Sequence, residues 1–470
     1  MLFSSLVFLF LFLPITLIIY HLLPKKKLTA RNIFLLAVSL LFYAWGGVWY
    51  LLLMLAVILI NYGGALWVSI GKPKQKYKLW IVVVANLLIL FYFKYFNFFI
   101  HIIEGITRHD INIFEVLLPI GISFYIFQAL SYFFDVYGKK CKVQRNPLKL
   151  ALYISLFPQL IAGPIVKYSD IETQINYRVH TSKQFYYGVR RFIYGLSKKV
   201  IIANTLGMVA DKIFENHPAQ LGMGVAWLGI ICYALQIYFD FSGYSCMAIG
   251  LGAMFGFTFR ENFNHPYIST SVQDFWRRWH ISLSSWFKEY VYIPLGGNRK
   301  GKARTYLNLL IIFTLTGIWH GANWTFLVWG LFYGFFLVIE RMFLGNALKR
   351  NPQKIFNWLY TMLVVLIAWV FFRSPDMGYA MKYLGAMFGF YGANGIQPAI
   401  YYLTMNAILI FPFAVLFCGI LQNWLRKPIE KFKTATWVFW VESACLFVML
   451  CTCILLLANN TYNPFIYFQF

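Results

Sequence analysis

The chain has 470 residues, of which 60% are hydrophobic, 20% aromatic and only 12% charged. An ordinary soluble domain carries roughly 25% charged residues, so this composition excludes a soluble fold. The net charge is +25, but the Lys and Arg residues fall mainly in short clusters between apolar runs, which is typical of cytoplasmic loops rather than of a nucleic-acid interface. Because the apolar runs are continuous, we expect an all-α polytopic protein that contacts membrane lipid and no nucleic acid.

The first apolar run, residues 2–23, lacks the basic start and the small-residue cleavage site of a signal peptide. It is expected to be a transmembrane helix that ends at Pro24. Further runs of spanning type follow at residues 32–45, 48–70, 79–101, 116–137, 200–214, 222–243, 305–320, 324–343, 355–372, 400–424 and 436–458. The basic clusters at residues 25–31, 72–78, 139–149, 260–304, 341–354 and 426–433 are expected in the cytoplasm, which gives about twelve crossings with both termini outside.

Two segments between these spans are expected not to cross. Residues 150–166 are interrupted by two prolines and a glycine, and broken backbone at membrane depth must be buried in protein or line a cavity. This segment is therefore predicted to be re-entrant from the cytoplasm. Residues 184–199, which end in Lys199, are predicted to lie along the cytoplasmic surface as an amphipathic helix.

The chain shows no internal repeat and no soluble domain, so residues 1–470 are expected to form one transmembrane domain. The seven cysteines are odd in number, lie mostly in apolar runs and show no metal-ligand spacing. They are interpreted as packing residues, and no metal site is expected.

The segment SVQDFWRRWHISLSSWFK carries apolar side chains at helical spacing, and residues 274–288 are predicted to form one helix. Asp274 can pair with Arg277 or Arg278, and His280 falls on the apolar side. One interpretation is an interfacial anchoring helix with a snorkelling histidine. The other is a site in which the arginines meet an anionic ligand and His280 faces a cavity.

His320, in GIWHGANWTFLVWG, lies inside a run that otherwise reads as membrane. An ionisable side chain at membrane depth is costly, which makes it a candidate functional residue. A structural histidine bonded to a neighbouring helix is the alternative. The small residues after it leave the backbone free to open, and Asn323 can cap the next helix or hold the imidazole in one tautomer.

Other features carry less weight. Asp240 lies in the apolar run IYFDFSGYSCMAIG, where Ser242 and Gly243 are expected to interrupt the helix. Lys94 and Glu442 are single charges for which snorkelling or interhelical pairing suffices. The segment IPLGGNRKGK has no Walker spacing and is interpreted as a turn, and GxSxG, HExxH and CxxC motifs are missing from the sequence.

Taken together, these segments resemble the membrane-bound O-acyltransferase family, in its branch that O-acetylates exported bacterial polysaccharides. The resemblance covers nearly the whole chain. It is carried by FSSLVFLFLFLPI, LPIGISFYIFQALSYFFDVY, FPQLIAGPIVKY, IYFDFSGYSCMAIGL, DFWRRWHISLSSWFKEYVYIPLGGNR, GIWHGANWTFLVWG and NPFIYFQF. Cys246 and Asn204 depart from the family pattern, which often has acids there, and this bears on subfamily or helix pairing rather than on the reaction.

The resemblance implies a ring of tilted helices around a central tunnel, with His320 as the catalytic histidine and His280 as the second active-site position. It also implies that the protein lies in the inner membrane of a bacterium. The acyl-CoA donor would come from the cytoplasm, the acceptor would be extracytoplasmic, and a periplasmic partner of the SGNH-hydrolase type would be involved. Substrate-binding roles are expected for Asp274, Arg277, Arg278, Trp279, Trp319, Asn323, Trp324, Tyr238, Asp240 and Ser242.

The function expected from these motifs is acetyl transfer across the membrane, with acetyl-CoA as donor substrate and no permanently bound cofactor. His320 would act as general base, and Asn323, Trp319 or Trp324 would supply a hydrogen bond to the oxyanion. Two alternatives stay open. One is a transporter or flippase for an activated acyl donor or lipid-linked sugar, and the other is D-alanyl transfer to teichoic acid on the same fold.

Overall fold

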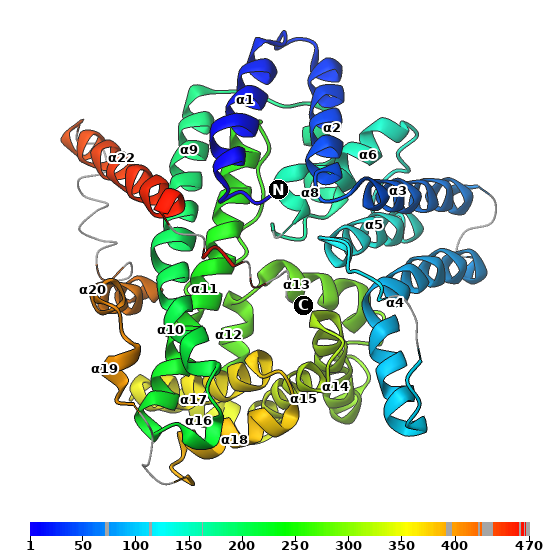
Figure 1. The fold of residues 1–470 in the computed structure, drawn as a ribbon. Coiled ribbons are helices and arrows are strands. Elements are labelled where there is room, and N and C mark those ends of the chain that lie inside the picture. The colour runs from blue at the N-terminus through cyan, green and yellow to red at the C-terminus, as the bar shows by residue number, and fades with distance from the viewer. Residues whose placement is uncertain are drawn as a thin grey trace. The chain divides into compact units, whose positions relative to one another are not determined.

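The structure, a computed structural model, describes residues 1–70, 75–111, 115–161, 163–391, 397–421, 424, 436–459, 462–464 and 466. Every regular element within these residues is a helix (Figure 1). Six helices are long and apolar enough to cross a membrane: Val48–Ser69, Lys76–Thr107, Met223–Met254, Trp324–Arg350, Lys354–Arg373 and Trp437–Asn459. Shorter apolar helices are Phe8–Leu22, Leu28–Ala44 and Met405–Ile420. The chain is thus an all-α polytopic membrane protein, and the number of about twelve crossings stays a prediction.

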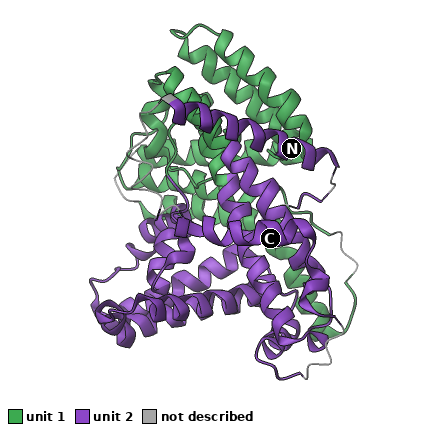
Figure 2. Ribbon diagram, turned by 90° about the vertical axis from the view of Figure 1, so that its left-hand side faces the viewer, with its two compact units in different colours: residues 1–192, 245–260 green, residues 193–244, 261–470 purple. Residues whose placement is uncertain are grey.

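Contacts divide the chain into two compact units, one of residues 1–192 and 245–260 and the other of residues 193–244 and 261–470 (Figure 2). The expectation of a single transmembrane domain stays a prediction. Two helices contribute residues to both units, namely α9 (Ser182–Ser197) and α11 (Met223–Met254). All the candidate site residues belong to the second unit.

In the first unit, α2 packs on α6, and α3 packs on α4 and α5. Its elements are η1 (Phe8–Phe12), α1 (Leu13–Leu22), α2 (Leu28–Ala44), α3 (Val48–Ser69), α4 (Lys76–Thr107), α5 (Ile122–Tyr137), α6 (Pro147–Ser155), α7 (Phe157–Leu160) and α8 (Tyr168–Asn176). The break predicted within residues 150–166 is confirmed, because α6 and α7 are short and largely buried. The re-entrant path from the cytoplasm remains a prediction.

The second unit is organised around the antiparallel pair α14 and α15, on which α17 packs. Its first elements are η2 (Lys198–Ala203), α10 (Asn204–Phe214), η3 (Pro218–Gln220), η4 (Pro266–Ile268), α12 (Val272–Arg278), α13 (Ile281–Phe287), η5 (Lys288–Tyr292) and α14 (Gly301–His320). They are followed by α15 (Trp324–Ile339), η6 (Glu340–Leu344), α16 (Gly345–Arg350), α17 (Lys354–Arg373), α18 (Met377–Met387), α19 (Ala399–Tyr402), α20 (Met405–Val415), η7 (Leu416–Ile420) and α22 (Thr436–Asn459).

The surface helix predicted for residues 184–199 is wrong at its end. The backbone stays helical from α9 through η2 into α10, and Lys199 is only 1% exposed. Its ammonium lies 2.8 Å from the Asp240 carboxylate, and it also donates to the backbone oxygen of Pro464. A buried lysine needs such a pair, so these contacts draw Lys199 into the unit rather than onto a surface.

The expected interruption at Ser242 and Gly243 is also wrong, because α11 runs through both residues without a break. Gly243 serves close packing instead. A Cβ there would lie 2.8 Å from the backbone oxygen of Gly195 on α9. The glycine therefore lets two helix backbones approach each other rather than ending a helix.

Candidate active site

His280 does not lie inside one long helix, as the sequence predicted, but at a break between α12 and α13. Trp279 is extended, and His280 adopts the left-handed conformation with φ 45° and ψ 53°. A residue other than glycine held there costs about 1–3 kcal/mol, so surrounding contacts must fix it. The break directs the imidazole into the unit, where His280 is fully buried.

Asn262 supplies most of these contacts. Its backbone oxygen accepts from the Ile281 N–H at 2.9 Å. Its side-chain Oδ1 accepts from the backbone N–H of Ser282 at 3.0 Å and from the Ser282 hydroxyl at 2.8 Å. The same oxygen lies 3.2 Å from Nδ1 of His280. Burial lowers the pKa of His280 to about 3, so the ring is neutral near pH 7.

Aromatic rings from two helices enclose the His280 imidazole. The Phe241 ring of α11 meets it edge-on, with centroids 4.7 Å apart. The Trp319 indole of α14 lies 6.0 Å away. Since Trp319 also lies 4.9 Å from the His320 ring, the structure brings both histidines to one indole.

His320 is the last residue of α14 and is only 3% exposed. Its ring is surrounded by Trp319, Trp329 and Phe372, at centroid distances of 4.9, 4.9 and 5.2 Å. The helix ends because Gly321 turns extended, and Asn323 then caps α15 by accepting from the Thr325 N–H at 3.1 Å. The predicted break after His320 and the predicted cap are confirmed.

The α14–α15 pair is held at backbone distance by glycines. A Cβ at Gly317 would lie 2.4 Å from the backbone oxygen of Phe326, and one at Gly330 would lie 2.3 Å from that of Phe313. This close approach places Trp329 beside His320. Trp329 is fully buried, and its Nε1 has no hydrogen-bond partner among the described residues.

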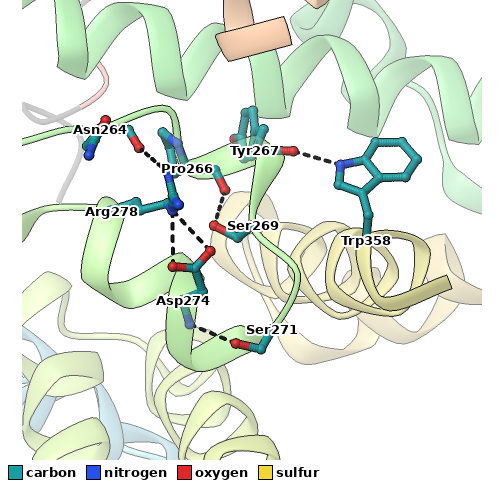
Figure 3. Close-up of polar contacts among 8 residues, drawn as sticks. All are labelled: Asn264, Pro266, Tyr267, Ser269, Ser271, Asp274, Arg278 and Trp358. Carbon is teal, nitrogen blue, oxygen red and sulfur yellow. Dashed lines mark hydrogen bonds and ion pairs between the residues drawn. The ribbon is translucent and has the colours of Figure 1, made fainter. Parts of the chain in front are cut away.

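The acid–base pair at α12, Asp274 with Arg278, is structural. Asp274 binds Arg278 through both carboxylate oxygens, at 3.1 and 3.0 Å, and Arg278 also donates to the backbone oxygen of Asn264 (Figure 3). Ser271 caps the helix by accepting from the Asp274 N–H at 3.0 Å. Asp274 and Arg278 therefore fasten α12 to the preceding loop, and neither is among the residues that line the cavities described next.

Two adjoining cavities open beside α12, and Arg277 lines both. The first, about 610 Å³, has a basic wall from η6 and α16; its charged lining residues are Arg277, Glu340, Arg341, Lys349 and Lys354. The second, about 340 Å³, is largely apolar and is lined mainly by α13 and α14, with Trp276, Leu283, Phe287, Leu309, Ile312, Phe313 and Thr316 among its residues. Gln273, Arg277, Asn298, Leu337 and Arg341 border both cavities.

The apolar cavity follows one face of α14 toward His320. Ile312 and Thr316 line it, and His320 follows Thr316 after one further helical turn on the same face. Trp276 of α12 also lines this cavity, and its buried Nε1 has no hydrogen-bond partner among the described residues. A basic cavity that adjoins an apolar one suits an elongated ligand with an anionic head and a slender tail.

The remaining predicted residues divide into two groups. Trp279 and Tyr238 are buried in the same aromatic cluster, 6.3 Å apart, and lie near the His280 turn. Asp240 instead faces Lys199 and accepts from the backbone N–H of Ile466 at 3.1 Å. Ser242 is buried, with no hydrogen-bond partner for its hydroxyl among the described residues.

Two of the expected oxyanion donors lie in other surroundings. The Asn323 amide is occupied, since its Nδ2 donates to the Pro375 oxygen at 2.7 Å while its oxygen caps α15. Trp324 is 54% exposed. The indoles that contact the His320 ring are those of Trp319 and Trp329.

Sequence reasoning missed four residues of this region. Asn262 and Trp329 are ordinary in their local patterns, and only the fold shows that they touch His280 and His320. Glu340 accepts from the N–H groups of Val272 and Gln273, at 2.6 and 3.0 Å, and so caps α12 from a distant helix. Arg341 belongs to a basic cluster that indicates a cytoplasmic loop. The sequence gives no other sign that it lines a cavity.

The chain matches known proteins over most of its length. Residues 35–379 match the model of the membrane-bound O-acyltransferase family. A probable alginate O-acetylase AlgI of Pseudomonas putida is 42% identical over the full length of both chains. The peptidoglycan O-acetyltransferase of Helicobacter pylori is 34% identical over all of this chain and 98% of its own length. The teichoic acid D-alanyltransferase of Bacillus subtilis is 26% identical over 62% of this chain and 74% of its own.

A family model that covers most of the chain, together with full-length relatives above 30% identity, supports an acyltransferase rather than the transporter alternative. The two histidine motifs, the buried imidazoles and the adjoining cavities lie in the region that the family model matches. The chain therefore belongs to the membrane-bound O-acyltransferase family and is an O-acyltransferase.

Proposed function

We propose that this protein takes an acetyl group from cytoplasmic acetyl-CoA and passes it across the inner membrane of a bacterium to an extracytoplasmic hydroxyl. The final acceptor is an exported polysaccharide, reached directly or through a periplasmic SGNH-hydrolase-type partner. The observation that carries the proposal is the position of His320, buried at the end of the α14 face that lines the apolar cavity.

The donor is supported by the paired cavities. Arg277, Arg341, Lys349 and Lys354 give the larger one a surplus of positive charge over Glu340. Phosphate groups bind well to guanidinium forks, so this cavity suits the phosphorylated nucleotide of coenzyme A. The narrower apolar cavity suits the thioester arm, with the Trp276 indole N–H as a donor for one of its carbonyl oxygens.

The chemistry follows from placing the thioester carbon beside His320. The imidazole removes the proton from the acceptor hydroxyl while its oxygen attacks the thioester carbonyl. The C–S bond then breaks, the ester forms, and the proton passes from His320 to the departing thiolate. One acetyl ester and one free thiol result, so atoms and charge balance without a metal or a redox step.

The developing oxyanion needs a hydrogen-bond donor, and the Trp329 indole N–H is the source favoured here. Its ring touches His320, and it lies in a fully buried position where an unmet donor costs about 1–3 kcal/mol. A donor that is fixed before the reaction stabilises charge that appears only in the transition state.

The acceptor class rests on the relatives. Those with 34–46% identity are named as alginate O-acetylases or a peptidoglycan O-acetyltransferase, so a polysaccharide hydroxyl is the acceptor that we propose. The D-alanyltransferases are 26% and 28% identical and cover 62% and 50% of the chain. This difference favours acetyl over D-alanyl transfer.

The test uses the full chain purified in detergent, with acetyl-labelled coenzyme A and alginate or peptidoglycan fragments as acceptors. We expect acceptor-dependent release of free thiol, reduced roughly 10²- to 10⁴-fold in His320→Ala. His217→Ala, which removes an exposed loop histidine, is the matched control and should keep full activity. Wild-type-rate transfer by His320→Ala would refute the proposal, and so would activity with a D-alanyl carrier thioester alone.

A further inference from the structure

We propose that Asn262 is a positioning residue which fixes the tautomer of His280, so that His280 acts as a neutral hydrogen-bond acceptor through Nε2. This inference rests on the proposed acyl transfer for its catalytic meaning, but it can be measured without it.

The first step is the identity of the amide atom. The backbone N–H of Ser282 can only donate, and it points to the Asn262 side chain at 3.0 Å. The facing atom must therefore be the amide oxygen and not the nitrogen. The Ser282 hydroxyl, at 2.8 Å, donates to the same oxygen.

The second step is the proton on the histidine. An amide oxygen has no hydrogen and can only accept. Nδ1 of His280 lies 3.2 Å from this oxygen and 3.4 Å from the Ser282 hydroxyl oxygen. Because the hydroxyl hydrogen is donated to Asn262, both oxygens face Nδ1 as acceptors, so Nδ1 carries the hydrogen and the lone pair of a neutral ring lies on Nε2. This makes His280 an acceptor for an N–H or O–H group, and not the cation that would bind phosphate.

The third step is rigidity. Asn262 binds both residues after His280, through its backbone oxygen to Ile281 and through its side chain to Ser282. These bonds hold His280 in its left-handed conformation and place Nδ1 against the amide. One asparagine therefore sets the backbone, the orientation and the protonation pattern of the ring.

Two ion pairs lie on the elements around His280. On α11, Asp240 lies next to Phe241 and pairs with Lys199 of η2 at 2.8 Å. On α12, Asp274 pairs with Arg278 at 3.0 Å. Glu261 precedes Asn262 in the chain, and His320 follows Trp319 on α14. Burial is the cause that lowers the pKa of His280.

The expected role is to orient a hydrogen-bearing group of a substrate, either an amide N–H of the donor arm or the acceptor hydroxyl. An imidazole locked in the other tautomer would present N–H to that group and repel it. The same holds for an imidazolium, which has no acceptor lone pair. Catalysis should therefore depend on Asn262 without any contact between Asn262 and the reacting atoms.

The decisive measurement is nitrogen NMR of the full chain with ¹⁵N-labelled histidine, in which His280→Gln assigns the ring signals. We expect a protonated Nδ1 and an unprotonated Nε2 from about pH 5 to 8. A protonated Nε2 near pH 7, in either the other tautomer or the imidazolium, would overturn the inference whatever the activity shows.

Asn262→Asp separates an electronic role from a structural one. It keeps an acceptor oxygen for Ser282 and for Nδ1 but adds a negative charge beside the ring, which favours the imidazolium. We expect the pKa of His280 to rise by roughly one to three units and acetyl transfer to fall at acidic pH. Asn216→Asp, just after the end of α10, is the control and should leave the pH profile unchanged.

The outcomes distinguish the two proposals. If wild type transfers acetyl groups but Asn262→Asp keeps the wild-type pH profile, the positioning role is wrong and the proposed function stands. If wild type does not use acetyl-CoA, the proposed donor is wrong, and the NMR signals still decide the tautomer. Asn262→Leu removes the acceptor. The factor by which kcat falls should be roughly ten to a hundred times larger than the factor by which KM changes.

Discussion

Trp329 is the residue that we expect to assist His320 most, through the N–H group of its indole. Its ring is fully buried and lies 4.9 Å from the His320 ring, edge to face. Its Nε1 meets no hydrogen-bond acceptor among the described residues. A buried donor without a partner is costly in a resting protein, and a substrate oxygen would relieve that cost during the reaction.

Trp329→Phe keeps most of the ring and removes only the N–H. We expect kcat for acetyl transfer to fall roughly 10²- to 10³-fold with little change in KM, because the lost hydrogen bond forms mainly in the transition state. Steady-state kinetics on detergent-purified protein would measure this. Trp49→Phe, at a position 81% exposed, should behave as wild type, and an equal loss in both variants would contradict the role of Trp329.

His280 also makes a pH prediction about stability. Its pKa is lowered by burial to about 3, against a usual value of 6.5. Between these pH values the unfolded chain takes up a proton at His280 and the folded protein does not. The free energy of unfolding therefore falls as the pH falls from about 6.5 toward about 3. Above about pH 6.5, His280 is neutral in both the folded and the unfolded state, and its full contribution to the stability is present.

The measurement is the thermal unfolding midpoint in detergent at pH 7 and at pH 4.5, compared between wild type and His280→Gln. The variant cannot take up the proton, so its midpoint should fall less on acidification than that of wild type. Identical shifts in the two proteins would show that the folded His280 titrates normally.

At the scale of elements, the α14–α15 pair determines where His320 and Trp329 lie. Its two backbones touch at Gly317 and Gly330, where a Cβ would come within 2.4 and 2.3 Å of a backbone oxygen on the other helix. Backbone atoms cannot move aside as a flexible side chain can. A methyl group at either position must therefore separate the helices.

Gly330→Ala should destabilise the protein by about 1–3 kcal/mol and lower acetyl transfer more than the stability loss alone explains. Circular dichroism melting and transfer assays on the same preparation would test this. Gly63→Ala is the matched control, because its Cβ would meet nothing within 4 Å in α3 and alanine favours a helix by about 1 kcal/mol. Equal behaviour of the two variants would contradict the close-packing account.

Glu340 connects two elements, since its carboxylate on η6 accepts from the first N–H groups of α12. Glutamine can accept only one of these bonds and places an NH₂ against the other. Glu340→Gln should therefore loosen the start of α12, displace Arg277 and raise the KM for acetyl-CoA roughly three- to tenfold. Glu215→Gln, at an exposed position, should leave KM unchanged.

The sequence was informative wherever local pattern decides the structure. Apolar runs predicted helices, Asn323 was a correct cap, and the small residues after His320 marked a true break. It failed where a distant contact overrides the pattern. The helical spacing of residues 274–288 gave no sign that Asn262 would hold His280 in a left-handed turn.

The same limit explains the errors on α11 and at Lys199. Gly243 looked like a helix breaker because the sequence does not show which backbone lies against it. Lys199 looked like a surface charge because its partner, Asp240, lies on another helix. The candidate site was recognised through its two histidine motifs, whereas Trp329 and the Asn262 contact required the three-dimensional arrangement.

At the scale of the whole molecule, the surplus of positive charge supports the anionic donor that we propose. The chain carries 41 Lys and Arg against 16 Asp and Glu, and part of this surplus forms the basic wall of the larger cavity. Arg341→Ala should raise the KM for acetyl-CoA about five- to tenfold, with a smaller effect at high salt because screening weakens the wild-type contact. Arg350→Ala, on the same helical segment but outside the cavity lining, should change neither value.

The most direct test of the central claim is the acetyl content of exported polysaccharide in the native strain. The chromosomal gene would encode wild type, His320→Ala or His217→Ala, and the cells would be fed labelled acetate. We expect labelled acetyl esters on the exported polymer with wild type and His217→Ala, and their loss with His320→Ala at equal protein level in the membrane. Normal acetylation with His320→Ala would contradict it.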